Sequence, residues 1–402
     1  MAPSFSIRTR DPGSRARTGT LHLAHGEVRT PAFVPLATKA VVKTLEVSEV
    51  RELGFDMVLS NTFHLLLAPG PELIERFGGV HRFMRWDGPV ITDSGGFQIF
   101  SMGHGTVADE IKGRASRGTG AGAILAIEED GVRFRSYVDG SEQFMGPETS
   151  MGVQAALGSD IALAFDECIP FHVTRDYNAR STERTHRWLD RCLEWHADHG
   201  PPDQAVFGIV QGGVHEDLRK LSAEAVSAAA VDGLAIGGTL GRDKQEMHAV
   251  LEMTAPMLPL DAPKHLLGIG EPDDLLAGIA LGIDIFDCAV PTRLARHGMA
   301  LAPLPGSRFR FDVGKARLAT DQGPLVDGCP CPTCASHTRA YLHYLARAEE
   351  LTAGRMLTLH NLTFLERLVA GAREAISAGA FGAYREAVLG GAAPWEAHSR
   401  DG

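Results

Sequence analysis

Eight short apolar segments alternate with longer spans of helical periodicity, and this alternation constrains the fold more than any other feature. Each segment has the length and composition of a buried strand and ends in polar or glycine residues. Eight such strands separated by helices predict the α/β class and a parallel (β/α)8 TIM barrel. A doubly wound sheet is less compatible, because no Gly-x-Gly-x-x-Gly turn follows the first strand. The strands are expected at residues 32–36, 57–60, 89–92, 161–165, 206–210, 234–236, 265–269 and 283–286.

Helices are expected between these strands, and several of them close on a glycine, as helix ends often do. The span 103–142 interrupts the rhythm because it is glycine-rich and polar, although residues 131–139 alternate like a strand. We interpret this span as an insertion on the barrel rim. The predicted helices cover residues 42–54, 147–158, 181–199, 216–231, 244–257 and 272–282.

The two ends of the chain differ from the barrel pattern. Four arginines among the first 17 residues could belong to a transit peptide, but alternating residues on both sides of Asp11-Pro12-Gly13 favour an N-terminal β-hairpin. After residue 293 a segment rich in proline and cysteine leads into a helical tail at 338–389. The sequence therefore predicts a barrel with hairpin and insertion at 1–298, and a smaller helical subdomain at 299–402 packed on it.

The composition is that of a globular protein that works away from membranes. A chain of 402 residues with 44% hydrophobic residues is long enough for one large domain and an attached smaller one. No apolar run approaches the roughly 18 residues of a membrane helix, so a cytoplasmic protein is expected. The net charge of -11 means that any nucleic-acid partner would have to meet a local basic patch.

Carboxylates follow three of the predicted strands. Asp93, Asp166 and Asp287 each come directly after an apolar run, and the C-terminal strand ends of a parallel barrel converge on one face. Each acid alone could be a helix N-cap or a solvated loop residue. Together in one partly buried cup they should raise at least one pKa, which would separate a nucleophile or base from a neutral donor. The sequence therefore predicts an active site in this cup.

Asp287 lies in the most informative stretch, residues 282–298. An apolar strand delivers it to the barrel face, and Arg293 and Arg296 supply positive charge beside it. A basic strip beside an acidic cup suits a polyanion whose backbone is gripped while one nucleotide is presented for reaction. A solvated face is the simpler interpretation of the charges alone. The strip continues through Arg308, Arg310, Lys315, Arg317, Arg339 and Arg347.

Glycine pairs follow three strands, at residues 95–96, 212–213 and 237–238. They would let the backbone approach a flat ligand and offer its N–H groups, although tight strand-helix turns use the same residues. Phe97 and Leu267 could lie above and below a planar ring, or could be core residues.

Three cysteines, Cys329, Cys331 and Cys334, form a Cys-x-Cys-x-x-Cys motif, whereas the other three are scattered. This is not a disulfide framework, and it predicts a structural zinc site that one imidazole completes. A closed Cys3His set leaves no coordination position for a substrate, so the metal would hold the subdomain together. Spacing alone does not choose among His337, His343 and His360.

Together these residues resemble bacterial members of the tRNA-guanine transglycosylase (queuine tRNA-ribosyltransferase) family. The resemblance covers about residues 29–368, and its motifs stand in the family's order. They are SNTFHLLLAPG, ITDSGGFQIFS, FDECIPF, FGIVQGG, GLAIGG, HLLGIGEPDDL, FDCAVPTRLARHG and CPCPTC followed by LTLHNL.

The resemblance implies a role for each motif. Asp287 would be the nucleophile that attacks the anomeric carbon of a tRNA guanosine and forms a covalent ribosyl-enzyme, which a 7-deazaguanine then attacks. Asp93 would be the general base, oriented by Asn61. Arg293 and Arg296 would meet the RNA. The implied base-binding residues are Phe97, Asp166, Cys168, Gln211, Gly238 and Leu267, and the implied ligands of one Zn2+ per chain are Cys329, Cys331, Cys334 and His360.

The resemblance also implies the substrates and the assembly. They are tRNAs with a GUN anticodon, whose wobble guanine is exchanged in queuosine biosynthesis, and a homodimer. The bacterial motif set favours 7-aminomethyl-7-deazaguanine as the incoming base. However, bacterial members commonly continue the Gly-Gly after the sixth strand as Leu-Ser/Ala-Val-Gly-Glu, which helps to read the 7-substituent. Here the residues after Gly238 are Thr239-Leu240-Gly241-Arg242, and the loop is one residue shorter.

Two alternatives belong to other functional classes. A non-catalytic RNA-binding subunit of the same fold would be expected to lose the nucleophile or the base, and both are present. A zinc-dependent nucleoside hydrolase would need carboxylate or histidine ligands in the barrel mouth, where we expect acids but no accompanying histidine.

Overall fold

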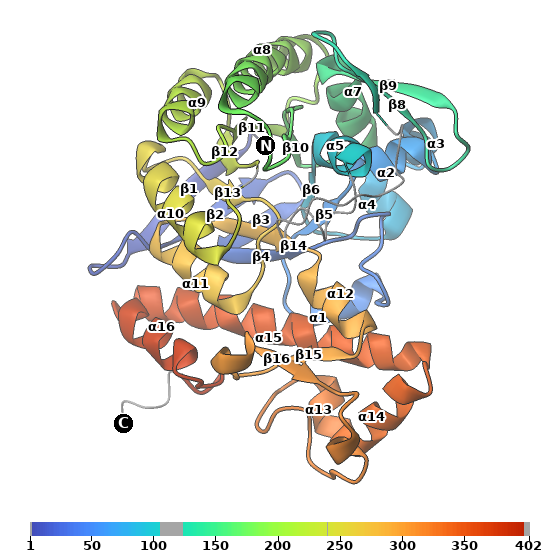
Figure 1. Ribbon diagram of the computed structural model, residues 1–402, viewed down its shortest axis with the longest axis vertical. Helices are drawn as coiled ribbons and strands as arrows, with labels where there is room; N and C mark the ends of the chain where they lie inside the picture. The colour runs from blue at the N-terminus through green and yellow to red at the C-terminus, as the bar shows by residue number, and fades with distance from the viewer. Residues whose placement is uncertain (1, 105–123, 239, 398–402) are drawn as a thin grey trace.

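The computed structural model describes residues 2–104, 124–238 and 240–397, and its centre is a parallel barrel (Figure 1). The barrel strands are β4 (Ala32–Pro35), β5 (Val58–Ser60), β6 (Val90–Thr92), β10 (Ile161–Leu163), β11 (Ala205–Val210), β12 (Gly233–Ile236), β13 (Lys264–Leu266) and β14 (Ile285–Cys288). They are hydrogen-bonded in the order β4-β14-β13-β12-β11-β10-β6-β5, and every adjacent pair is parallel. A parallel bridge between Leu36 and Leu59 joins the two end strands. The predicted TIM barrel is confirmed.

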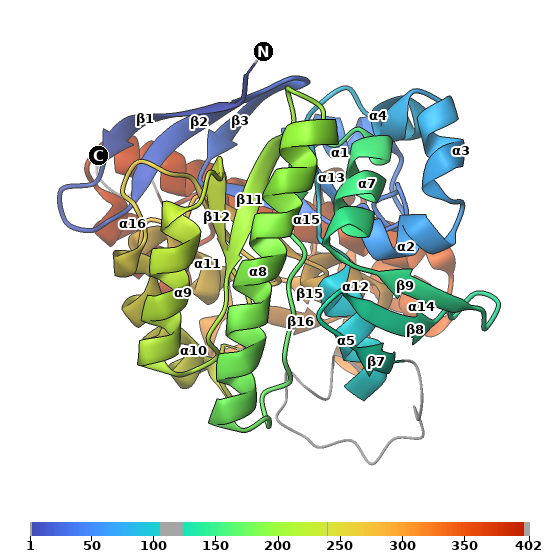
Figure 2. The same ribbon diagram turned by 90° about the horizontal axis from the view of Figure 1, so that it is seen from above.

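The barrel interior is filled by apolar side chains that alternate with outward-facing residues along each strand. Ile91, Leu163, Phe207, Ile209 and Ile285 are buried there in one cluster. A three-stranded antiparallel sheet of β1 (Ser4–Arg10), β2 (Arg17–Leu23) and β3 (Gly26–Thr30) covers the N-terminal end of the barrel and adds apolar residues to the same cluster (Figure 2). The predicted hairpin is confirmed, and a third strand that the sequence did not predict extends it.

Helices cover the outside of the barrel: α1 (Val47–Glu52), α7 (Pro147–Leu157), α8 (Arg175–His199), α9 (Glu216–Ala228), α10 (Lys244–Thr254), η1 (Ala255–Met257) and α11 (Pro272–Ala280). α8 begins earlier than predicted, where the Thr174 side chain accepts a hydrogen bond from the Tyr177 amide at 3.2 Å. The predicted helix start at residue 42 was wrong, because Ala40 and Thr44 have positive φ angles of 55° and 75°. In the part of the chain that the structure describes, no helix has both the length and the hydropathy to cross a membrane.

Two connections carry additional elements. Between β5 and β6 lie α2 (Thr62–Leu67), α3 (Pro71–Arg76) and α4 (Gly79–Met84). After β6 come α5 (Gly96–His104) and a second antiparallel sheet, formed by β7 (Ile124–Ile127), β8 (Val132–Arg135) and β9 (Glu142–Met145). The strand predicted within the insertion is confirmed as β8, and residues 105–123 of that insertion lie outside the described residues.

The C-terminal elements pack along one side of the barrel (Figure 1). They are α12 (Val290–Arg296), β15 (Met299–Leu301), η2 (Pro305–Ser307), β16 (Arg310–Asp312), η3 (Ala316–Leu318), α13 (Pro332–Ser336), α14 (Arg339–Arg347), α15 (Leu351–Ser377) and α16 (Phe381–Leu389). The long helix α15 contacts β4 and α12 and is buried along much of its length. Both the barrel and the last elements therefore share this helix, and the predicted boundary between residues 298 and 299 stays a prediction.

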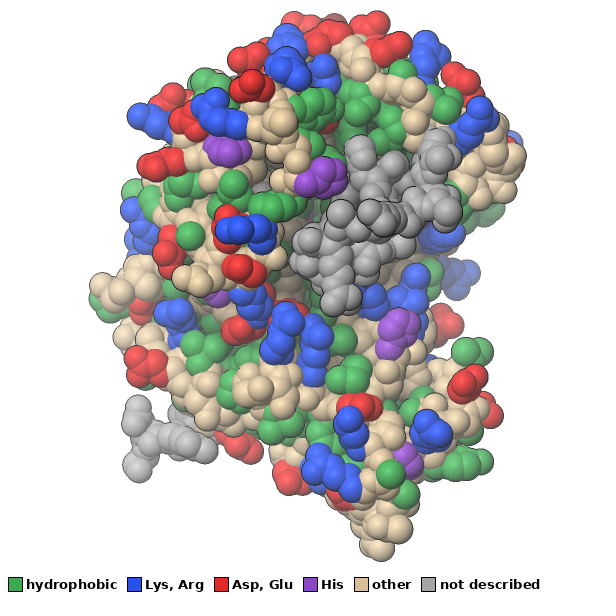
Figure 3. All heavy atoms as spheres, viewed as in Figure 1, with side chains coloured by type: hydrophobic (Ala, Val, Ile, Leu, Met, Phe, Trp, Pro, Cys, Tyr) green, Lys and Arg blue, Asp and Glu red, His purple; other side chains and the backbone are tan. Residues whose placement is uncertain are grey.

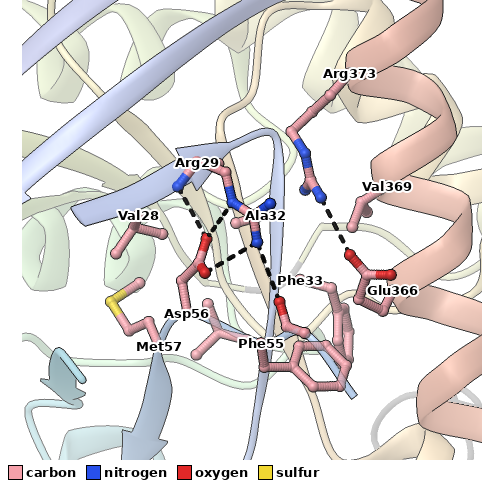
Figure 4. Close-up of a pocket in the computed structure, with 12 residues that line it drawn as sticks. Val28, Arg29, Ala32, Phe33, Phe55, Asp56, Met57, Glu366, Val369 and Arg373 are labelled. Carbon is pink, nitrogen blue, oxygen red and sulfur yellow. Dashed lines mark hydrogen bonds and ion pairs between the residues drawn. The ribbon is translucent and has the colours of Figure 1, made fainter. Parts of the chain in front are cut away.

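A small pocket between α15 and the N-terminal ends of β4 and β5 contains two ion pairs (Figure 4). Arg29 Nε lies 2.9 Å from Asp56 Oδ2, and Arg373 Nη2 lies 3.1 Å from Glu366 Oε1. Arg373 also donates to the carbonyl oxygen of Pro31 at 2.8 Å. This end of a TIM barrel usually carries stabilising residues rather than catalytic ones, so we interpret the pocket as the seam that fixes α15 to the barrel.

Candidate active site

Asp93, which directly follows β6, is surrounded by donors that fix both of its carboxylate oxygens. The Thr62 amide donates to Oδ1 at 2.9 Å, while the side-chain amides of Asn61 and Gln98 donate to Oδ2 at 2.5 and 3.0 Å. Asn61 is the N-cap of α2, and its Oδ1 accepts a hydrogen bond from the His64 amide at 2.9 Å. The helix start therefore fixes the orientation of Asn61, and Asn61 in turn fixes that of Asp93.

Asp93 has the titration of a proton-transfer group. Burial raises its pKa to about 7, and the charge of Asp287 contributes to the rise, while the hydrogen bonds from Thr62 and Gln98 oppose it. The residue keeps some exposure towards the pocket, although its carboxylate is enclosed by these donors. A carboxyl group with this pKa can both accept and return a proton near neutral pH.

Asp287 lies within β14, one position before the strand ends, rather than just after the strand as the sequence suggested. Its Oδ1 accepts hydrogen bonds from His265 Nε2 at 2.8 Å and from the Gly268 amide at 3.2 Å. Among the described residues, Oδ2 has no protein donor. One oxygen is therefore held by the barrel and the other is available to a ligand. The expectation that no histidine accompanies the acids was wrong, because His265 lies directly beside Asp287.

Asp166 is buried beyond the end of β10 and binds two side chains from neighbouring loops. Ser94 Oγ donates to its Oδ1 at 2.9 Å, and Gln211 Nε2 donates to its Oδ2 at 2.6 Å. Burial raises the pKa of Asp166 to about 6 against these two hydrogen bonds. Each oxygen retains acceptor capacity, so the ionised group can bind the N–H edge of a flat heterocycle.

Gly238 and Gln211 meet at the loop after β12. Gly238 has a φ of +80°, and a Cβ at this position would collide with Gln211 Oε1. That oxygen is buried and has no hydrogen-bond partner in the described part of the chain. A buried amide oxygen without a partner is costly, so a ligand donor is the natural partner for it. The next residue, Thr239, where the sequence departs from the family pattern, lies outside the described residues.

Arg219 supports this region from below and was not predicted from the sequence. The guanidinium is fully buried on α9 and donates to the carbonyl oxygens of Gly213, Val210 and Gly237 at 2.7, 3.0 and 3.0 Å. Burial lowers its pKa to about 10. It therefore ties together the two glycine loops that follow β11 and β12. No local pattern distinguishes Arg219 from the surface arginines of other helices.

Three further predicted base-binding residues lie around these groups. Phe97 at the start of α5 is 43% exposed, which leaves its ring accessible for stacking. Leu267 follows β13 and is half-buried beside Gly237, and Cys168 is half-buried two residues after Asp166. Their roles in stacking and at the pocket edge stay predictions.

The cysteine motif and α15 form a possible metal site. The sulfur atoms of Cys329, Cys331 and Cys334 lie 3.7, 3.4 and 3.3 Å from His360 Nδ1, and all four ligand atoms could bind one metal ion. His360 Nε2 donates to the Leu301 carbonyl oxygen at 2.7 Å, which leaves Nδ1 facing the sulfur atoms. His360 is thus selected over His337 and His343. Among the described residues, none of the possible metal-binding groups includes Asp93, Asp166 or Asp287, which gives no support to a metal-dependent hydrolase.

Positive charge gathers beside the cup at α12. Figure 3 shows Lys and Arg side chains across the middle of this face, between the barrel and the C-terminal elements. Arg293 is half-buried and Arg296 is exposed. Partial burial, together with the charges of Arg296 and Lys39, lowers the pKa of Lys43. Arg296, Lys39 and Lys43 therefore lie close together.

Other members of the predicted basic strip are paired with acids, which corrects the sequence expectation. Arg308 and Arg310 both bind Glu271, at 2.9 and 2.5 Å, and Arg339 lies 3.2 Å from Asp321. Fewer members of the strip are therefore available to a polyanion than the sequence suggested, and Arg293 and Arg296 on α12 are among those that remain.

Comparison with known proteins gives consistent matches over almost the whole chain. A family model described as queuine tRNA-ribosyltransferase matches residues 11–392. A queuine tRNA-ribosyltransferase of Roseiflexus sp. (strain RS-1) is 48% identical over 399 residues, covering 97% of this chain and 100% of the relative. The proteins of the same name from Symbiobacterium thermophilum and Pelotomaculum thermopropionicum are 45% and 46% identical over 390 residues each. These two alignments cover 97% of this chain and 91% and 98% of those relatives.

Proposed function

The chain belongs to the queuine tRNA-ribosyltransferase family, and on this basis we propose that it exchanges the wobble guanine of tRNA through a covalent ribosyl-aspartate intermediate. The enzyme is a tRNA-guanine transglycosylase of queuosine synthesis, and therefore a pentosyltransferase. A non-catalytic RNA-binding role is not supported.

In the proposed first step Asp287 Oδ2 attacks C1′ of the target ribose. The C1′–Oδ2 bond forms as the C1′–N9 bond breaks, and the electron pair leaves with guanine, which takes a proton from the neutral form of Asp93. In the second step a 7-deazaguanine loses its N9 proton to Asp93 and attacks C1′, which releases Asp287 as a carboxylate. Two displacements with a carboxylate nucleophile divide one difficult substitution at a sugar carbon into two easier ones.

The observation that carries this proposal is the different environment of the two acids. Asp93 has both oxygens occupied by donors and a pKa of about 7, whereas Asp287 has one oxygen held and one available. These environments suit a proton carrier and a nucleophile respectively.

The test replaces the nucleophile by its closest non-nucleophilic analogue. Asp287→Asn should abolish incorporation of labelled guanine into tRNA and the appearance of a denaturation-resistant tRNA adduct. Asp217→Asn, on the exposed face of α9, serves as the control and should exchange guanine at the rate of the parent enzyme. Exchange or adduct formation by the Asp287→Asn enzyme at the parent level would refute the nucleophile assignment.

Recognition of the base is assigned to the groups that have acceptor capacity left. Asp166 and Gln211 Oε1 would accept hydrogen bonds from the base edge, the Gly238 backbone would approach it, and Phe97 and Leu267 would stack on its faces.

We propose 7-aminomethyl-7-deazaguanine as the incoming base. An exchange assay that offers guanine, 7-cyano- and 7-aminomethyl-7-deazaguanine and queuine in parallel would decide this, and a clear preference for another base would reject it.

Binding of tRNA is assigned to the cations of α12 and to the metal-held elements behind them. Zinc fits the Cys3His donor set, and as a closed tetrahedral site it would supply structural cross-linking and no open position for substrate. Arg293 and Arg296 would contact phosphates on either side of a target nucleotide in a GUN anticodon. Because its substrate is tRNA, the enzyme is expected to work in the cytoplasm.

A homodimer is proposed on the basis of large apolar side chains left at the surface of the C-terminal elements. Tyr341 and Tyr344 on α14 are 42% and 63% exposed, and Leu351 at the start of α15 is 90% exposed. Sedimentation velocity of the purified protein tests this assembly, and a monomer at micromolar concentration would contradict it.

A further inference from the structure

His265 is a polar side chain in the apolar interior of the barrel. In the parallel sheet it lies beside Ala235 of β12 and Ile285 of β14, and both of these residues belong to the interior cluster. Its exposure is 0%. An interior layer of a TIM barrel is normally filled by branched aliphatic side chains, so an imidazole here requires a specific partner. The small side chain of Ala235 leaves room for the ring.

The partner of His265 is Asp287. Asp287 is two residues beyond Ile285 on the same strand and therefore points to the same side, one layer closer to the cup. His265 reaches up to it, and Nε2 lies 2.8 Å from Oδ1. The Gly268 amide approaches the same oxygen at 3.2 Å. Oδ1 therefore receives both protein hydrogen bonds found among the described residues, and the carboxylate cannot rotate without losing them.

The environment of the other ring nitrogen, Nδ1, shows which nitrogen of His265 donates a proton to Asp287. His265 Nδ1 is buried and has no hydrogen-bond partner in the described part of the chain. A proton on Nδ1 would be an unsatisfied buried donor, so Nε2 is the ring nitrogen that donates to Asp287. The described residues therefore offer no acceptor for a proton relay through the ring.

We propose that His265 is a positioning residue for the glycosyl-transfer reaction, holding Oδ1 of Asp287 so that Oδ2 faces the anomeric carbon. This inference rests on the proposed nucleophilic role of Asp287. When Oδ2 bonds to C1′, Oδ1 becomes the carbonyl oxygen of the ester and its hydrogen bond to Nε2 weakens. When the second base attacks C1′ and the C1′–Oδ2 bond breaks, the electron pair returns to the carboxylate and the hydrogen bond strengthens. His265 therefore assists most in the second step, in which Asp287 leaves.

The matched pair His265→Gln and His265→Met separates donation from packing. Glutamine can place an amide N–H near the position of Nε2, whereas methionine has a similar length and volume without a donor. We expect kcat for His265→Met to fall about a hundredfold, the loss typical of a misplaced reacting group, and KM for tRNA to fall as well, because slowing the second step makes the covalent adduct accumulate. His265→Gln should recover most of that loss. Because the second step is slowed more, the fraction of His265→Met enzyme trapped as covalent tRNA adduct at steady state should exceed that of the parent enzyme.

His248 provides a control, because it makes a similar contact with Asp274, at 2.9 Å, outside the cup on α10. His248→Met should keep the parent kcat. The inference is overturned if His265→Met keeps the parent kcat, or if His265→Gln and His265→Met lose activity equally while both melt near the parent temperature. If His265→Met fails to fold, His265→Gln still decides, since a folded Gln enzyme whose kcat falls about a hundredfold would also reject donation. Absence of any adduct in the parent enzyme would instead reject the proposed function and not His265 alone.

Discussion

Single residues in the cup obtain their roles from their neighbours rather than from their own chemistry. Asp93 and Asp287 are identical side chains, yet donors contact both oxygens of the first, whereas Oδ2 of the second has no protein donor among the described residues. The pKa of Asp93 is raised to about 7 mainly by burial, with a further contribution from the charge of Asp287. Two carboxyl groups in one pocket can therefore divide proton transfer and nucleophilic attack between them.

The raised pKa predicts the direction of the pH dependence. Asp93 must be ionised to accept the proton of the incoming base, so kcat/KM for that base should fall as the pH drops through about 7 and level off above it. Asp93→Asn should remove this limb and lower kcat by about 10²-fold or more. Initial rates on both sides of neutrality check this result. A parent profile that stays flat through this range, or an Asn variant with an unchanged limb, would contradict the assignment.

Elements show how much of the molecule could be predicted from the sequence. The eight strands were predicted because short continuous apolar runs that end in polar or glycine residues are local signals. The third strand of the N-terminal sheet was missed because Gly26–Thr30 has a single apolar side chain, Val28, although it pairs with the strand directly before it. The first helix was misplaced because left-handed turns at Ala40 and Thr44 leave no clear signal. Residues at strand ends were predicted for the same local reason. His265 and Arg219 were not predicted, because their importance arises from sheet register and from contacts between the two loops that follow β11 and β12.

The helix α15 connects the metal site to the arginines of α12. Adjacent to His360, Asn361 Nδ2 donates to the carbonyl oxygens of Pro291 and Met299 at 3.0 and 3.1 Å, and its Oδ1 accepts from the Leu301 amide at 2.7 Å. Movement of this part of α15 would therefore displace the start of α12.

We predict that removal of the metal weakens tRNA binding. The metal content of the cup should not change. Cys331→Ser should lose the bound zinc, lower the melting temperature and raise the Kd for tRNA at least about tenfold, because structural zinc contributes directly to folding. Cys192→Ser, which alters a buried thiol outside the cluster, is the control and should keep its zinc. Metal analysis and tRNA titration of both variants provide the measurement. Full tRNA affinity in zinc-free enzyme would show that the site has another purpose.

At the scale of the whole molecule, a net charge of -11 must be reconciled with a polyanionic substrate. Several surface arginines form ion pairs with acids. In the described part of the chain, Arg296, Lys39 and Lys43 beside the acidic cup form no such pair. Local charge of this kind orients the substrate, because repulsion elsewhere on the surface disfavours other modes of binding.

This arrangement predicts a specific salt dependence. Arg296→Ala should raise the Kd for tRNA and reduce the slope of log Kd against log salt concentration by about one, the value for one lost phosphate contact. Arg82→Ala on α4, at the opposite end of the barrel, should leave both quantities unchanged. Filter binding over a range of salt concentrations checks this pair. Equal effects of the two substitutions would mean that tRNA affinity depends only on the overall charge of the protein.

The seam between α15 and the base of the barrel has a consequence for synthesis on the ribosome. Arg373 binds the Pro31 carbonyl oxygen, so residues separated by most of the coding sequence meet at the first barrel strand. A nascent chain that has already formed all eight strands still lacks the helix that packs on β4, and this flank is protected only after α15 has been translated. We expect stalled chains that end before α15 to be degraded or held by chaperones, and protease sensitivity of such ribosome-bound chains would reveal whether they are. Protection of the first barrel strand therefore depends on synthesis of α15.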